Sequence, residues 1–157
     1  MGWNLEVACV RLSKGADIGQ VVPDVFSASG TVVGFEDATS ASRGTDLCAA
    51  TIGKWAVLID VACRLSDAEP WLKEASAGGD LFLVRVADNP VALHYREGQA
   101  ITECRGVGDC AAALGRPPDA AGWIDGEQLA CELLKAWTRL NFPNKFWTAR
   151  FEVFAAD

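Results

Sequence analysis

The chain has 157 residues, of which 50% are hydrophobic and 22% charged, and its net charge at pH 7 is −7. A chain of this length can bury roughly 70% of the surface that it exposes when unfolded, so one core suffices and we expect a single domain over residues 1–157. Because phosphate binding draws on clustered lysine and arginine, which this acidic sequence does not have, we expect no nucleic acid partner.

The sequence gives no sign of export or of membrane insertion. Its start has no basic stretch leading into an apolar run, as a secretory signal would. Charged residues such as Lys54, Asp60, Asp80 and Arg85 interrupt the apolar stretches before they reach the roughly 20 residues that span a bilayer. We therefore expect a cytoplasmic protein without a membrane partner. Its 6 cysteines lie mostly among apolar neighbours, which favours buried free thiols over disulfides.

In chain order, the first predicted element is a strand over residues 4–12, which is rich in β-forming side chains. A short helix is possible over residues 19–26, where Pro23 limits its length. Residues 27–44 are rich in Ser, Thr, Ala and Gly, and we expect a loop there with one short strand.

A hairpin is the clearest prediction in the next part of the chain. Two β-rich runs, residues 45–52 and 55–61, flank Gly53 and Lys54, a connection typical of a tight turn. Ser66 with Glu69 three residues later resembles a capping box and predicts a helix to about residue 77.

Residues 81–87, 91–96 and 100–104 are three β-like runs separated by turn residues, which predicts an antiparallel meander. Asp109 is then a candidate cap for a brief helix ending at Leu114.

The strongest helix prediction begins at Asp125, whose carboxylate can cap it. Leucine and tryptophan side chains follow at spacings of three and four on one face; they are Leu129, Leu133, Leu134, Trp137 and Leu140. Residues 146–154 alternate in character and predict a last strand. Together these elements predict an α+β fold, in which an antiparallel sheet of five to seven strands packs against two or three helices. These include a long C-terminal helix before the last strand.

Residue patterns for catalysis or metal binding are weak. His94 is the only histidine and lies within a predicted strand, which favours a place on the sheet surface or in the core. Zinc sites of the common kinds need C-x-x-C spacing, which the sequence lacks, and the spacing of Cys104 and Cys110 matches no standard ligand pair. The segment 105–109 lacks the third glycine or the Lys-Ser/Thr pair of a nucleotide loop, so we expect a turn. We predict no catalytic residue, no cofactor and no metal.

Carboxylates and tryptophans offer the best candidates for binding. Glu36 and Asp37 are adjacent, and Asp67 is close to Glu69; paired acid-base catalysis depends on a distance in space that sequence does not give, and a solvated acidic surface is the commoner outcome. Trp71 and Trp123 lie beside helix starts or loops and are candidates for exposed anchors, although burial is the commoner fate of tryptophan.

Residues 53–60, followed by a helix, residues 80–84 and residues 91–95, resemble a group of small bacterial proteins with a G-x-W strand, a helix and a meander. The resemblance covers residues 45–115. Acidic α+β proteins of this size include immunity proteins that neutralise toxins of interbacterial competition. The resemblance therefore implies a non-enzymatic inhibitor that binds a cognate toxin.

An acidic surface suits a basic toxin, because complementary charge speeds association and adds specificity. We take as candidate contacts the acidic residues and the tryptophan beside them, namely Glu36, Asp37, Asp67, Glu69 and Trp71.

Two alternatives are open. One is a small-molecule or peptide-binding domain with an apolar pocket between the sheet and the C-terminal helix. The other is an enzyme that uses two carboxylates facing each other in a cleft. A flat acidic patch with exposed aromatic side chains would favour the immunity hypothesis instead. The sequence leaves the oligomeric state and the activity of the toxin open.

Overall fold

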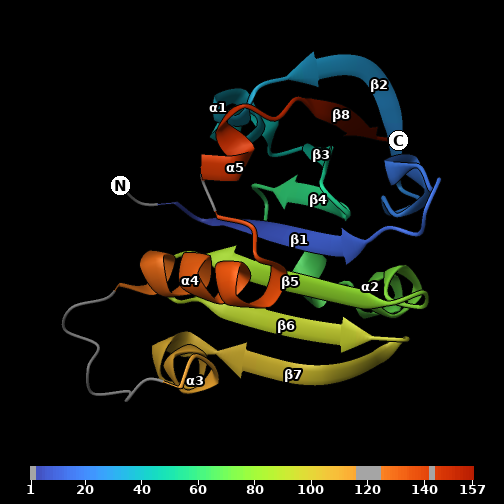
Figure 1. Cartoon of the computed structure of the whole chain (residues 1–157). Coiled ribbons are helices and arrows are strands. Elements are labelled where there is room, and N and C mark those ends of the chain that lie inside the picture. Colours follow the sequence, from blue (N-terminus) through green and yellow to red (C-terminus); the bar gives the residue numbers. More distant parts are fainter. Residues whose placement is uncertain (1–2, 116–124, 142–143) are drawn as a thin grey trace.

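The computed structural model describes residues 3–115, 125–141 and 144–157. Within them, 8 strands form one sheet in the order β2-β8-β3-β4-β1-β5-β6-β7, with every neighbouring pair antiparallel (Figure 1). The strands are β1 (Leu5–Arg11), β2 (Phe26–Val33), β3 (Asp46–Ile52), β4 (Trp55–Asp60), β5 (Asp80–Val86), β6 (Val91–Arg96), β7 (Gln99–Arg105) and β8 (Phe151–Ala156).

Helices cover both faces of this sheet. The α-helices are α1 (Phe35–Ala38), α2 (Glu69–Ala75), α3 (Gly106–Ala113), α4 (Gly126–Thr138) and α5 (Asn144–Trp147), and the 3-10 turns are η1 (Ile18–Gln20), η2 (Ala41–Arg43) and η3 (Leu65–Asp67). Residues of α1, α3, α4 and α5 belong to the core on one face, and residues of η1, η3 and α2 to the core on the other. Among the described residues, no helix has the length and apolar character to cross a bilayer.

β1 shows why the core has two layers. Side chains alternate between the faces of a strand, and in β1 Val7 and Cys9 enter the α4 side while Ala8 and Val10 enter the α2 side. A strand that is buried on both faces is apolar at consecutive positions. This accounts for the central place of β1 between β4 and β5.

The structure confirms the α+β class, the antiparallel sheet, the hairpin of β3 and β4 and the meander of β5 to β7. It also confirms the cap of α4, since the Asp125 carboxylate accepts a hydrogen bond from the backbone N–H of Gln128 at 2.7 Å. The prediction of five to seven strands with two or three helices was wrong, because the described residues form 8 strands and more than three helices. The long helix α4 is also not C-terminal in the chain, since α5 and β8 follow it.

β2 lies where we expected a loop with one short strand, and it is longer than that prediction, since it runs over 8 residues. Its residues are exposed on both faces except at its ends. A strand without a buried face needs no apolar alternation, and so the sequence pattern that identifies strands is missing there.

The predicted start of the last strand and the predicted capping box at Ser66 were both wrong, because buried contacts outweighed the local sequence pattern in each case. Helix α5 takes the first two residues of the predicted strand 146–154, Phe146 and Trp147, and Phe146 is completely buried there. Ser66 does not cap α2, which has Ala68 at its N-cap; the backbone N–H of Ser66 instead donates to the Glu6 carboxylate at 2.9 Å.

The segment 105–109 was predicted as a turn with Asp109 as a helix cap. In the structure α3 already begins at Gly106, so Asp109 lies in its first turn. Its carboxylate accepts a hydrogen bond from the backbone N–H of Arg105 at 3.2 Å.

Candidate functional site

The five predicted contact residues lie on two sides of the sheet. Glu36 and Asp37 belong to α1, on the α4 side, whereas Asp67, Glu69 and Trp71 belong to η3 and α2 on the opposite side (Figure 1). They therefore do not form one continuous patch, and each group is described separately.

On α1, Asp37 is already paired within the chain. Its carboxylate lies 2.9 Å from the Arg43 guanidinium, and the hydrogen bond from Arg43 lowers the pKa of Asp37 below its ordinary value. Glu36 and Asp37 line an open depression together with Trp147, whose side chain is 57% exposed. This surface combines an acidic pair with an exposed aromatic ring.

On α2, the predicted residues divide between an ion pair and a pocket. Glu69 lies 2.9 Å from the ammonium group of Lys73, one helical turn further along. Asp67 is exposed on η3. Trp71 is half-buried and forms one wall of a pocket that neither of these two carboxylates lines.

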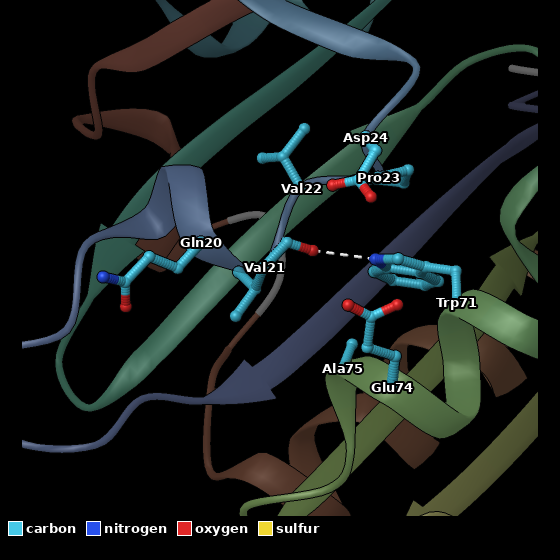
Figure 2. Close-up of a pocket in the computed structure, with 8 residues that line it drawn as sticks. All are labelled: Gln20, Val21, Val22, Pro23, Asp24, Trp71, Glu74 and Ala75. Carbon is cyan, nitrogen blue, oxygen red and sulfur yellow. Dashed lines mark hydrogen bonds between the residues drawn. The ribbon is translucent and has the colours of Figure 1, made fainter.

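The pocket at Trp71 has a volume of about 250 Å³ and lies between α2 and the segment that leads from η1 to β2. The indole Nε1–H donates a hydrogen bond to the carbonyl oxygen of Val21 at 2.8 Å, which fixes the ring as a wall (Figure 2). The carboxylates of Asp24 and Glu74 also line this space.

These two carboxylates lack the basic partner that Asp37 has in Arg43 and that Glu69 has in Lys73. Among the ion pairs of the described residues, none includes Asp24 or Glu74, and both side chains are exposed. The face of a tryptophan ring attracts cations through its quadrupole, and carboxylates attract them by charge. The Trp71 pocket thus has the chemistry to hold one lysine or arginine side chain.

Local structure explains how the chain builds the pocket. Leu72 is buried in the core and fixes α2 on the sheet. Residues three apart lie on the same side of a helix, which places Glu74 one turn beyond Trp71. On the other wall, the Asp17 carboxylate accepts the backbone N–H of Gly19 at 3.2 Å and so caps η1, from which the segment to Asp24 continues.

Sequence reasoning missed Asp24 and Glu74. The helical spacing from Trp71 could have identified Glu74. Asp24 had no comparable signal. Strands β2, β3 and β4 separate it from α2 in the sequence, and only the folded chain brings it beside Trp71. Trp123, the other candidate anchor, lies outside the described residues.

The groups considered for catalysis have structural partners. His94 Nε2 lies 2.8 Å from the Asp80 carboxylate, and its ring stacks on Phe82 with centroids 4.3 Å apart. This agrees with the expected place on the sheet. Across the described part of the chain, no group of three or more His, Cys, Asp or Glu side chains is arranged to hold a metal ion.

All 6 cysteines are free thiols. Burial is the main cause that raises the pKa of Cys63 to about 11 and that of Cys131 to about 12. Thiolate is the reactive form, so these environments suppress nucleophilic chemistry.

Comparison of the chain with protein-family models, with curated proteins and with solved structures finds no match.

Proposed function

We propose that this protein is a non-enzymatic inhibitor of the immunity type, which binds a basic bacterial toxin and neutralises it. The observation that carries the proposal is the Trp71 pocket, where a fixed indole stands beside two carboxylates without a basic partner among the described ion pairs. Buried aromatic anchors and charge complementarity are the features that give protein interfaces their affinity and specificity.

The pocket suits a protein side chain better than a small-molecule ligand. Small-molecule sites usually have volumes of roughly 300–1,000 Å³ and enclose their ligand, whereas this pocket measures about 250 Å³. The space between the sheet and α4, where the alternative hypothesis expects an apolar pocket, holds the completely buried side chains of Leu129, Leu133 and Leu134.

The presence of two carboxylates in one pocket also bears on the enzyme alternative. General acid catalysis needs one carboxyl group that keeps its proton near neutral pH, and enzymes achieve this by burial or by a close second charge. Asp24 and Glu74 are both exposed to solvent. Their setting favours attraction of a cation over proton transfer.

The proposal is tested by capture of the partner from the native host with the tagged full-length chain, at moderate salt, followed by mass spectrometry. We expect one stoichiometric basic protein that is toxic when it is produced without this chain. The double variant Asp24→Asn/Glu74→Gln should lose this protein.

The control is Glu36→Gln/Asp37→Asn, which makes the same change of charge on the other side of the sheet and should retain the partner. If the control variant lost the partner and the pocket variant retained it, the binding site would lie at α1 instead. A captured protein without toxicity would reject the immunity role.

A further inference from the structure

Strand β2 is an open edge of the sheet, next to the Trp71 pocket. The order of strands gives β2 only one neighbour, β8, so its other side carries backbone groups that no strand of the described chain pairs with. Such an edge is a template for another strand. The segment Val21–Asp24 that lines the pocket continues through Val25 directly into β2.

The register identifies which backbone groups point outward. The N–H of Asp157 donates to the carbonyl oxygen of Val25 at 2.9 Å, which marks these two residues as a hydrogen-bonded pair. Hydrogen-bonded and non-bonded pairs alternate along an antiparallel ladder. The pair of Ala28 with Phe154 is therefore non-bonded, and the N–H and carbonyl groups of Ala28 point away from β8.

β2 has a bulge between Ala28 and Val32, and the residues on either side of it direct their backbone groups the same way. Val32 pairs with Glu152, two residues from Phe154 on β8, so its backbone groups also point outward. Within the bulge, the Ser29 hydroxyl donates to the Val153 carbonyl at 2.8 Å and accepts the Thr31 N–H at 3.2 Å. The bulge is thus tied to β8 and leaves Ala28 and Val32 as outward donors.

The two edge strands, β7 and β2, differ in how well their side chains prevent the addition of another strand. On β7, Glu103 and Arg105 form an ion pair at 2.8 Å, and charged side chains discourage strand addition. β2 contains no charged residue and no proline. Exposed apolar side chains lie just before β2, at Val25 (64%), and within it, at Val32 (46%).

The negative charge around β2 favours a basic partner strand. Carboxylates surround β2 in sequence and across the ladder, namely Asp24, Glu36, Asp37, Glu152 and Asp157. An antiparallel second copy would bring the acidic residues before β2 against those after it, and like charges repel. We propose that β2 accepts an extended, basic segment of the toxin as a ninth strand, continuous with the cation pocket at Trp71. The inference rests on the proposed function, because it assigns the same partner.

The test uses the isotope-labelled full-length chain and a short synthetic peptide in which lysine alternates with valine. Hydrogen exchange at the amides of Ala28 and Val32 should slow by about tenfold or more on addition of the peptide, as expected when backbone hydrogen bonds form. Exchange along β7 should not change. A peptide in which lysine alternates with proline has the same charge but cannot complete a ladder, and it should give no protection.

Ala28→Pro and Val32→Pro each remove an outward donor and should abolish protection at the remaining site, while the amide spectrum of the central strands stays the same. If neither variant folds, strand addition is judged from the hydrogen exchange at Ala28 and Val32 in the unmodified chain with the two peptides. Equal effects of both peptides, or no effect of either, would overturn strand addition. Protection that grows with protein concentration without peptide would identify a second copy instead, and would also overturn it.

The two proposals fail differently. Peptide protection of β2 combined with toxin capture that survives Asp24→Asn/Glu74→Gln would reject the pocket and keep the edge. Toxin capture that is lost in the pocket variant but unchanged in Ala28→Pro would keep the pocket and reject the edge.

Discussion

At the scale of single residues, the most unusual feature is a pair of buried carboxylates on two neighbouring central strands, each with an arginine beside it. Glu6 and Asp60 are completely buried and face each other in the register of β1 with β4. Arg85 lies 3.0 Å from Glu6, and Arg64 lies 2.8 Å from Asp60. Buried charges are tolerated only when paired and hydrogen-bonded, so these arginines explain how the carboxylates fit into the core.

Replacement of Arg85 by alanine should destabilise the fold strongly. It leaves the Glu6 carboxylate buried without its charge partner, and removal of one member of a buried pair typically costs about 3–5 kcal/mol. Urea unfolding of Arg85→Ala measures the loss. Arg105→Ala breaks the exposed pair with Glu103 and should change the free energy of unfolding little. Equal effects of the two variants would mean that burial of the Glu6 pair does not matter.

Asp80 should make stability depend on pH in the acid range. Burial alone would raise the pKa of Asp80, but hydrogen bonds from His94 and Arg96 outweigh it and hold the pKa below the ordinary 3.8. A group with a lowered pKa contributes stability above its unfolded pKa and loses it as the pH falls through the folded pKa. The stability difference between the wild type and Asp80→Asn should thus be largest near neutral pH and shrink below 3.8. A difference that stays constant in urea titrations throughout the acid range would contradict this account.

At the scale of elements, α4 is fixed by a close approach at its first residue. A Cβ atom at Gly126 would overlap the carbonyl oxygens of Ala87 and Asp88, which directly follow β5 in the connection to β6. α4 therefore sits against the sheet at a distance that only glycine permits.

Gly126→Ala should accordingly destabilise the protein, although alanine favours helices. Overpacking typically costs about 1–3 kcal/mol, whereas a glycine-to-alanine change in an open helix position gains roughly 0.5–1 kcal/mol. Gly108 in α3 is such a position, since nothing lies near its missing Cβ, and Gly108→Ala serves as the control. Thermal unfolding should show opposite shifts, and a stabilised Gly126→Ala variant would contradict the close packing.

The elements also show what sequence could predict. The β3–β4 hairpin and α4 have strong local signals, a glycine turn and a capped amphipathic face, and tertiary contacts agree with both. β2 has only a weak signal, enough for one short strand, because it buries little, and α5 has none, because it depends on the burial of Phe146. The candidate site was predicted in part: Trp71 lines the pocket, but Asp24 reaches it only through the fold.

At the scale of the whole molecule, the net charge is −7, and the pocket adds the carboxylates of Asp24 and Glu74, which take part in none of the ion pairs of the described residues. Long-range attraction between a negative protein and a basic partner is screened by salt. If the partner is the proposed basic toxin, its association rate should fall steeply as ionic strength rises. Asp24→Asn/Glu74→Gln should weaken this dependence, since it removes two charges at the contact.

The most direct test of the central claim is therefore the binding of the proposed partner, once captured, to the wild type, to Asp24→Asn/Glu74→Gln and to Glu36→Gln/Asp37→Asn, measured side by side at one salt concentration. The account predicts that the pocket variant binds at least about tenfold more weakly, as the loss of charged contacts at an interface implies, while the α1 variant binds nearly as the wild type does. Equal affinities of the wild type and the pocket variant would contradict the claim that the Trp71 pocket holds a basic side chain of the partner.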